Sequence, residues 1–302
     1  MNLITGYSGF LGKSIVKHFD PKKIVRLGRN KNSDIVFDFE KNNQIVNNEF
    51  NLRIETIIHA AGLAHVYPSD KSEKNKMYLI NITGTVKLLK YAEKLKKLKK
   101  IIFISSVSVY GIDQGQNINE NYSPTPNTIY GKSKLEAEKI IIDWAIKNNI
   151  KYYILRLPLV FGENPPGNLK KMITAIKNNR FFLIDNGKAK KSMVLANDIG
   201  KLISNISGES GVYNLNDGYH PSFKEISIIL SNKFNSKIPK SIPKVIAKII
   251  SKIGTFFLGS KFPLNKDVFL KITSDLTFDD NKARRKISWK SNKVIENNKL
   301  WK

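Results

Sequence analysis

Hydrophobic positions along the chain form short continuous runs that alternate with longer amphipathic stretches. The runs predict strands at Asn2–Thr5, Lys23–Leu27, Thr56–Ala60, Lys100–Ser105 and Lys151–Leu157. Amphipathic spacing predicts helices at Phe10–Phe19, Ile80–Leu95 and Ser133–Asn148. Parallel strands that are buried on both faces appear as continuous apolar runs, and helices join them. The order therefore predicts an α/β fold, a doubly wound parallel sheet of the Rossmann type.

The pattern changes after Phe161. A loop rich in Gly, Pro and Asn is predicted at residues 162–168, followed by a helix, a strand at Phe181–Asp185 and a helix from Asn197. A further strand at Gly211–Asn216 would return to the main sheet. We expect a dinucleotide-binding domain at 1–162, with 191–217 returning to it, and a smaller C-terminal substrate lobe built from 163–190 and 218–302.

Charge and composition narrow the classes of partner. The 302 residues include 51 Lys and Arg against 25 Asp and Glu, so the net charge is +26. The basic residues are scattered, without an arginine-rich helix, an aromatic RNA-binding motif or a Cys/His finger, which favours a solvated lysine-rich surface over nucleic-acid binding. Phosphate-bearing substrates or anionic lipid surfaces are the alternative partners. No metal-ligand spacing is present, and Cys is absent.

The start of the chain and its apolar runs bear on location. The first residues lack the basic and apolar regions of a secretory signal. No apolar run reaches about 18 residues without a lysine, so no membrane-spanning helix is predicted. We expect a cytoplasmic protein.

Three glycines stand between the first predicted strand and the first predicted helix. Gly6, Gly9 and Gly12 would let the backbone pass close to a pyrophosphate, whose charge would meet N–H groups at the helix start. A glycine triplet alone is weak evidence because loops are rich in glycine. Its position at a strand end and a helix start makes it specific, and it predicts a dinucleotide-binding loop.

A second motif pairs a tyrosine with a lysine. Tyr130 and Lys134 are four residues apart, so on a helix they share a face about 5–6 Å apart. A lysine ammonium in that place would lower the tyrosine's pKa and make it usable as an acid or base near neutrality. A serine hydroxyl at the end of the preceding strand, at Ser105 or Ser106, would bond the same substrate oxygen. These residues predict proton transfer to a hydroxyl or ketone.

Together these segments resemble the extended short-chain dehydrogenase/reductase family of nucleotide-sugar epimerases, dehydratases and reductases, along essentially the whole chain. Gly6-x-x-Gly9-x-x-Gly12 is similar to that family's nucleotide loop. His59–Gly62 and Asn81–Thr85 are similar to its fourth strand and the helix that follows. The likeness extends to bacterial surface-polysaccharide members: UDP-N-acetylhexosamine 4-epimerases, 4-keto-6-deoxysugar reductases, and epimerases of undecaprenyl-diphosphate-linked N-acetylglucosamine.

The resemblance implies roles for individual residues. Tyr130 would be the acid/base, Lys134 would bind the nicotinamide ribose and tune Tyr130, and Ser106 would hold the substrate oxygen. The implied cofactor contacts are Gly6, Tyr7, Ser8, Gly9, Phe10, Leu11, Gly12, Arg29, Asp38, Phe39, Ala60, Ala61, Gly62, Asn81, Ser105 and Leu157. The implied substrate contacts are His65, Val107, Ser108, Asn168 and Lys191. Because relatives are often dimers, a homodimer is implied as well.

Departures from the family pattern separate its activities. The 4,6-dehydratases have an Asp-Glu pair directly after the active hydroxyl residue, where this chain has Val107 and Ser108. The chain therefore lacks the acid/base pair that dehydration needs, which excludes a 4,6-dehydratase. A 4-epimerase and a 4-keto-sugar reductase are the remaining activities. Lys191 stands where many relatives use Arg for the sugar diphosphate, which keeps the charge and loses the bidentate fork. A non-catalytic nucleotide-binding protein on the same fold is the alternative of another class.

The choice between NAD and NADP depends on the end of the second strand. NAD-preferring relatives place an acidic residue there to accept a hydrogen bond from the ribose 2′-OH. This chain has Arg29 and no acidic residue in that segment, which slightly favours NADP(H), since Arg29 would pair with a 2′-phosphate. An ordinary surface arginine is the alternative.

One C-terminal segment, residues 242–258, is strongly amphipathic. Isoleucine and valine positions from Ile242 to Ile253 fall on one helical face, while Lys244, Lys248 and Lys252 lie elsewhere. Such a helix would either pack its apolar face within the substrate lobe or lie on an anionic membrane surface. In the second case the enzyme would work at the inner face of the membrane, and a lipid-diphosphate sugar becomes a candidate substrate.

Overall fold

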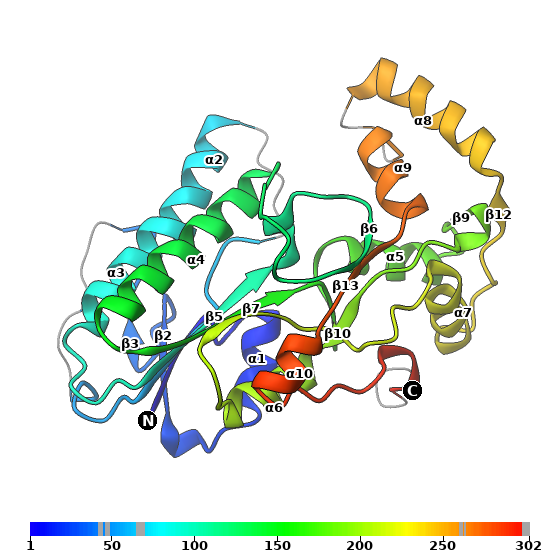
Figure 1. The fold of residues 1–302 in the computed structure, drawn as a ribbon. Helices are drawn as coiled ribbons and strands as arrows, with labels where there is room; N and C mark the ends of the chain where they lie inside the picture. Colours follow the sequence, from blue (N-terminus) through cyan, green and yellow to red (C-terminus); the bar gives the residue numbers. More distant parts are fainter. Residues whose placement is uncertain (42–44, 46–48, 65–69, 260–261, 263, 298–302) are drawn as a thin grey trace.

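A seven-stranded sheet with the strand order β11-β7-β5-β4-β1-β2-β3 forms the centre of the computed structural model, and every neighbouring pair is parallel (Figure 1). The structure describes residues 1–41, 45, 49–64, 70–259, 262 and 264–297. The strands are β1 Asn2–Thr5, β2 Ile24–Gly28, β3 Ile35–Val36, β4 Thr56–His59, β5 Lys100–Ser106, β7 Lys151–Leu157 and β11 Gly211–Asn214.

The strands that follow β1 in the chain are added first on one side of it, as β2 and β3, and then on the other side, beginning with β4. The order of the sheet therefore reverses at β1. Ligands of open parallel sheets bind at such a reversal, outside the carboxyl ends of the strands. The prediction of a doubly wound α/β fold is confirmed, and all five strands predicted before residue 160 are present. The sequence missed β3, a two-residue strand at the sheet edge.

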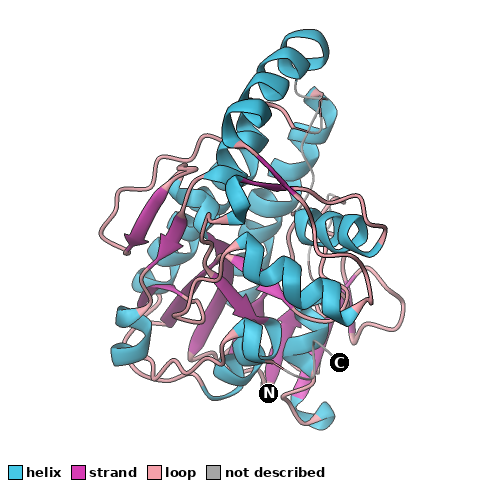
Figure 2. Ribbon diagram, turned by 90° about the vertical axis from the view of Figure 1, so that its right-hand side faces the viewer, coloured by secondary structure: helices cyan, strands magenta, loops and turns pink. Residues whose placement is uncertain are grey.

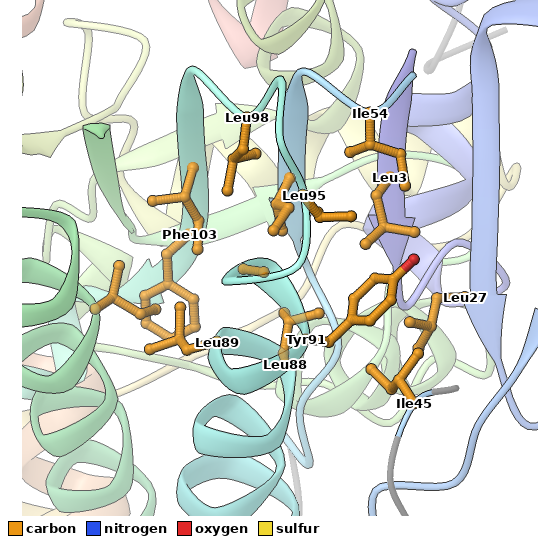
Figure 3. Packing of buried hydrophobic residues seen from close by; sticks show 14 of the residues in the cluster. Leu3, Leu27, Ile45, Ile54, Leu88, Leu89, Tyr91, Leu95, Leu98 and Phe103 are labelled. Atoms are coloured by element: carbon orange, nitrogen blue, oxygen red, sulfur yellow. The ribbon is translucent and has the colours of Figure 1, made fainter. Parts of the chain in front are cut away.

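Helices cover both faces of the sheet. On one face lie α2 Lys71–Tyr78, α3 Gly84–Ala92 and α4 Ile129–Lys147, and on the other lie α1 Phe10–Val16, α6 Ala196–Asn205 and α10 Asn281–Lys286 (Figure 1). Alternate residues of β5 explain the arrangement: Phe103 packs with Leu88 and Leu89 of α3 (Figure 3), whereas Ile102 joins the cluster that contains Ile15 of α1. Burial on both faces is why the strands appear as unbroken apolar runs.

A second region is built from short elements, most of which follow β7 in the chain. Its helices are α5 Gly167–Lys177, α7 Phe223–Lys233, α8 Lys244–Leu258 and α9 Lys266–Thr273. Three parallel two-stranded pairs accompany them: β8 Leu159–Phe161 with β10 Met193–Leu195, β9 Leu183–Ile184 with β12 Ser241–Ile242, and β6 Gly115–Ile118 with β13 Leu276–Phe278. In Figures 1 and 2 α8 lies at the top of the molecule, away from the large sheet.

Helix starts differ from the sequence prediction in an informative way. α4 begins at Ile129, four residues before the predicted start, because the Thr128 side chain accepts a hydrogen bond from the Gly131 N–H (3.0 Å) and caps the helix. Helical structure before β5 begins at Lys71 instead of Ile80 and passes through a π-helical turn at Leu79–Thr83. The loop predicted at 162–168 is shorter, because α5 already begins at Gly167.

Candidate functional site

The glycine loop joins β1 to α1 by a backbone path that leaves no room for side chains at two positions. Gly6 has a left-handed φ of +69°, and a Cβ there would lie 2.6 Å from the Ala61 nitrogen. At Gly12 a Cβ would lie 2.0 Å from the Gly6 carbonyl oxygen. The Gly9 N–H closes the turn on that oxygen (3.0 Å). The loop is thus a backbone cradle next to the end of β4, which fits the pyrophosphate of a dinucleotide.

Side chains of the same loop anchor it to the protein. The Tyr7 hydroxyl bonds Ser33 Oγ (3.0 Å), and its ring lies against Gly28 at the end of β2. The Phe10 ring packs over Gly162, and Leu11 packs against the core cluster under α1. Ser8 and Gly9 are exposed. The loop therefore offers a ligand mainly the backbone around Ser8 and Gly9.

At the end of β2 the structure brings an acidic residue that the sequence pattern missed. Glu40 lies 3.3 Å from the Arg29 guanidinium and 3.1 Å from the Lys76 ammonium. Arg29 is thus already paired with a carboxylate. The Asp38 side chain accepts a hydrogen bond from the Glu40 N–H (3.0 Å), and Phe39 is buried in the core. Phe39 therefore has only its backbone to offer a dinucleotide.

Asn81 connects the end of β4 to α4. It lies in the π-helical turn, and its side-chain oxygen accepts from the Leu63 N–H (2.7 Å) while its amide donates to the Leu63 carbonyl (3.1 Å) and to Ser133 Oγ (2.9 Å). Gly62 lies between Asn81 and Lys134, since a Cβ there would lie 3.2 Å from the Asn81 side-chain oxygen and 3.1 Å from the Lys134 ammonium. Ala60 and Ala61 precede it, against Gly6. Isolated π turns are frequent at functional sites.

Ser106, Tyr130 and Lys134 come together at the carboxyl end of β5. Ser106 is the last residue of that strand, its hydroxyl donates to Ser108 Oγ (3.1 Å), and it lies close enough to Tyr130 to influence the pKa of the phenol. Gly131 allows α4 to approach the segment that follows β5, because a Cβ there would lie 2.4 Å from the Ser108 carbonyl oxygen. The Lys134 ammonium donates to the Ile104 carbonyl (2.9 Å) under the same strand end.

The pKa of Tyr130 differs from the sequence prediction. Burial raises the pKa of Tyr130 to about 12, and the neighbouring Ser106 hydroxyl offsets this only in part. Burial lowers the pKa of Lys134 to about 8, partly opposed by the carboxylate of Glu138. In this arrangement the Lys134 ammonium is bound to the Ile104 carbonyl and lies over the Phe103 ring (4.6 Å). The expectation that Lys134 lowers the pKa of Tyr130 therefore stays a prediction for the site with its cofactor bound.

A buried ion pair behind the site was not anticipated from the sequence. The Arg156 guanidinium on β7 meets the Glu138 carboxylate on α4 at 2.7 Å and lies over the Tyr110 ring (4.8 Å). The Ser105 hydroxyl donates to the same carboxylate, so the Ser105 side chain is engaged behind the strand. Glu138 follows Lys134 by four residues, and that spacing was the available signal that the two share a face.

His59 forms a second buried polar chain. Its ring nitrogens bond Thr5 Oγ1 (2.8 Å) and Thr85 Oγ1 (3.0 Å), and the Ala61 N–H donates to Thr5 Oγ1 (3.1 Å). Burial, with a smaller contribution from Lys134, lowers the pKa of His59 to about 3. A neutral imidazole therefore ties β1, β4 and α3 together directly behind the glycine loop.

The predicted substrate residues are scattered. Val107 and Ser108 start the short 3₁₀ helix after β5, next to Ser106. Leu157, which was predicted as a cofactor contact, is buried at the end of β7. Asn168 is exposed on the first turn of α5, and His65 lies outside the described residues. Lys191 is buried, and its ammonium donates to the Ser274 carbonyl (2.9 Å).

Burial lowers the pKa of Lys191 to about 8, and Asp113 and Asp275 partly oppose this. No cluster of potential metal ligands occurs among the described residues.

Comparisons with known proteins agree with this geometry. The model of the NAD dependent epimerase/dehydratase family matches residues 2–215. An N-acetyl-alpha-D-glucosaminyl-diphospho-ditrans,octacis-undecaprenol 4-epimerase of Escherichia coli O157:H7 is 32% identical over 59% of this chain, and the match spans only 55% of that enzyme. The UDP-glucose 4-epimerase of Vibrio cholerae is 26% identical over 97% of this chain and 92% of its own length.

Solved structures show the same fold. The UDP-N-acetylglucosamine 4-epimerase from Methanobrevibacter ruminantium M1, in complex with UDP-N-acetylmuramic acid, matches with a TM-score of 0.73 at 21% identity. The match covers 99% of this chain and 95% of that one. MoeE5 in complex with UDP-glucuronic acid and NAD matches with a TM-score of 0.73 at 18% identity, over 97% and 94% of the two chains.

Proposed function

The chain belongs to the NAD-dependent epimerase/dehydratase family, and from that premise we propose that it is a 4-epimerase of a diphosphate-linked N-acetylhexosamine. The observation that supports this most directly is the convergence of Ser106, Tyr130 and Lys134 at the carboxyl end of β5, beside the glycine cradle. Two relatives that match this chain are named as 4-epimerases, one of a lipid-diphosphate sugar and one of UDP-glucose.

In the proposed reaction Tyr130 takes the proton of the sugar C4 hydroxyl and later returns it to the C4 oxygen. Ser106 donates a hydrogen bond to that oxygen and keeps it next to the phenol. The dinucleotide, when bound, supplies the hydride acceptor and then the donor at C4. Rotation of the 4-keto sugar in the site between these two transfers would present its other face to the returning hydride. The return would invert C4 and would also regenerate the cofactor in each cycle.

Tyr130 must be a stronger acid than it is in this structure to accept and release that proton near neutrality. Its pKa of about 12 keeps it a phenol. Lys134 lies one helical turn away, and a swing of its ammonium from the Ile104 carbonyl toward the phenol would lower the pKa of Tyr130. Lys134 would thus act as a binding group for the nicotinamide ribose and as an electrostatic partner of Tyr130.

NAD⁺ is the proposed cofactor. Arg29 had favoured NADP(H) on the sequence alone, but its guanidinium is paired with Glu40, whose carboxylate would repel a 2′-phosphate. The backbone around Ser8 and Gly9 would hold the pyrophosphate, and Asn81, Gly62 and Lys134 would line the nicotinamide side. Retention of NAD⁺ through the cycle would favour an epimerase over a reductase, which consumes NAD(P)H in each turnover.

Residues 163–190 and 218–302 are the proposed substrate lobe, and the carrier of the sugar is UDP or a polyprenol. Both carriers present a diphosphate, which suits the basic surface of this chain. Lys191 would need to leave the Ser274 carbonyl to reach that diphosphate. Surface-polysaccharide synthesis is the process in which such epimers would be used.

The test is to incubate the purified protein with UDP-N-acetylglucosamine or with undecaprenyl-diphospho-N-acetylglucosamine, without added dinucleotide. Formation of the C4 epimer of either compound supports the proposal, and the better substrate identifies the carrier. Gentle denaturation with mass spectrometry of the released dinucleotide should yield near-stoichiometric NAD⁺. An empty protein that binds NADPH better than NADH and reduces a 4-keto sugar would contradict the epimerase.

A further inference from the structure

α8 presents its large apolar side chains to solvent. Phe256 is 84% exposed, Phe257 76% and Val245 70%. Five more members of the same helix are over two-fifths exposed: Ile246, Ile249, Ile250, Ile253 and Leu258. Monomeric soluble proteins rarely leave a contiguous apolar surface of this kind uncovered, and where they do it serves an interaction.

The opposite side of α8 is the one that packs on the protein. Its buried residues are the small ones, Ala247, Ser251 and Gly254. At Gly254 a Cβ would lie 2.2 Å from the Phe262 ring, so the helix approaches this ring through a position that has no side chain. α9 lies next to α8 and has no fully buried residue of its own. The sequence alternative in which the apolar face of 242–258 packs within the lobe is therefore wrong.

Positive charge flanks the apolar face. Lys244, Lys248 and Lys252 recur every fourth residue, are exposed, and form a row beside the isoleucine and phenylalanine positions. The whole chain has a net charge of +26. Two such chains repel one another, whereas a surface of anionic lipid attracts each of them. The charge therefore selects an anionic lipid surface over a second copy of this chain as the partner of the apolar face.

The length of α8 suits a helix that lies along a membrane. Fifteen residues at about 1.5 Å each are shorter than the hydrocarbon core of about 30 Å. Among the described residues no helix is both long and apolar enough to cross a bilayer. An amphipathic helix with lysines beside its apolar face instead rests in the plane of the interface, with phenylalanine and isoleucine among the lipid chains.

α8 is also connected to the candidate site. α9, on which it packs, places Lys271 within 3.6 Å of Asp113, in the loop that leads away from Ser106. The residue that follows α9, Ser274, accepts the hydrogen bond from Lys191. A membrane bound by α8 would thus lie on the side of the protein that holds the proposed substrate lobe.

We propose that the exposed apolar face of α8, with its row of lysines, docks this protein on an anionic phospholipid membrane. The inference deepens the proposed function, because docking brings the site to sugars that are carried on membrane lipids. It does not depend on that function, since membrane binding is measured without any substrate.

The experiment is sedimentation of the full chain with vesicles of phosphatidylglycerol and phosphatidylcholine, compared with vesicles of phosphatidylcholine alone. We expect binding to the anionic vesicles that falls as salt is added. The double variant F256Q/F257Q should bind at least about tenfold more weakly, because two large apolar side chains leave the lipid. K244Q/K248Q/K252Q should lose about tenfold or more on anionic vesicles. I146Q, which changes an exposed isoleucine on α4, is the matched control and should bind like the unmodified protein.

Failure of the unmodified protein to sediment with anionic vesicles would overturn the proposal, as would equal binding by F256Q/F257Q. The competing partner is a second copy of this chain, and light scattering tests it by measuring the molar mass in solution. An oligomer that F256Q/F257Q converts to monomer would assign the apolar face to the second copy instead. Turnover of a soluble sugar nucleotide by F256Q/F257Q should be unchanged. Loss of vesicle binding with retained turnover separates failure of docking from failure of the proposed chemistry.

Discussion

α4 and α8 are both amphipathic helices, and they use their faces in opposite ways. α4 turns Lys134 and Glu138 inward, where both are buried, while α8 turns Phe256 and Phe257 outward and packs through Ala247 and its other small residues. Burying charge and exposing aromatic rings both cost free energy unless something else compensates. The proposed proton chemistry uses the buried polar face of α4, and the proposed membrane docking uses the exposed rings of α8.

The largest effect should come from the phenol at the start of α4. Y130F removes the proposed acid/base, and we expect turnover to fall by about 10²–10⁴-fold because proton transfer is lost. The amount of dinucleotide released on denaturation should stay near that of the unmodified protein. Y122F, which changes a partly exposed tyrosine outside the site, serves as the control. Near-normal epimerisation by Y130F would remove Tyr130 from the proposed role.

Breaking the buried ion pair between α4 and β7 should lower the free energy of unfolding. E138A leaves the Arg156 guanidinium buried without its carboxylate, and the free energy of unfolding should fall by about 3–5 kcal/mol. Urea denaturation measures this loss. E209A removes a carboxylate 2.7 Å from the Lys286 ammonium, but that pair is exposed and the change should be small. Equal losses in the two variants would show that burial of the first pair does not matter.

Replacing the buried lysine should stabilise the protein while it inactivates the site. Lys134 has a pKa of about 8 when folded against a usual value of 10.5, so its burial penalty is fully present below pH 8 and disappears as the pH rises toward 10.5. K134M should therefore raise the free energy of unfolding by about 1–3 kcal/mol at pH 7 and by much less at pH 10.

Urea denaturation at the two pH values measures this, with K132M on the exposed side of the same helix as control. A gain of equal size at both pH values would contradict the burial explanation.

The smallest effect should appear at α8, and it sharpens the contrast. F256Q should change the free energy of unfolding by no more than about 0.5 kcal/mol, because the ring is already in water. I141A in α4 removes a fully buried side chain and should cost about 2–5 kcal/mol. Urea denaturation of both variants tests this, and a large loss in F256Q would mean that the ring packs on the protein.

Local features of the site could be predicted from the sequence because they depend on neighbouring residues. The glycine loop needs its glycines within one turn of backbone, and helical spacing puts Tyr130 and Lys134 on the same face of α4. Features that depend on long-range packing were missed. Arg156 reaches Glu138 only because β7 lies beside β5 in the sheet, and no spacing rule encodes that neighbour.

Arg29 illustrates a second reason for such errors. Its partner Glu40 follows β3, which is too short to stand out in the hydrophobic pattern. Nothing in that pattern therefore indicated that a carboxylate returns to the end of β2. For α8 the periodicity correctly predicted an apolar face, but the side that packs was set by small residues. Ala247 and Gly254 are too small to stand out in the hydrophobic pattern, but both are buried, and Gly254 lets α8 approach the Phe262 ring closely.

The π-helical turn at Leu79–Thr83 limits how this chain can change its length. α2 and α3 continue into one another through the turn (Figure 1), but the wider turn holds one residue more than an α-helical turn would. The two halves are consequently out of phase by about 100° of rotation. Deleting one residue here would give a more regular helix, yet it would turn Asn81 away from Leu63 and Ser133 and unlink β4 from α4.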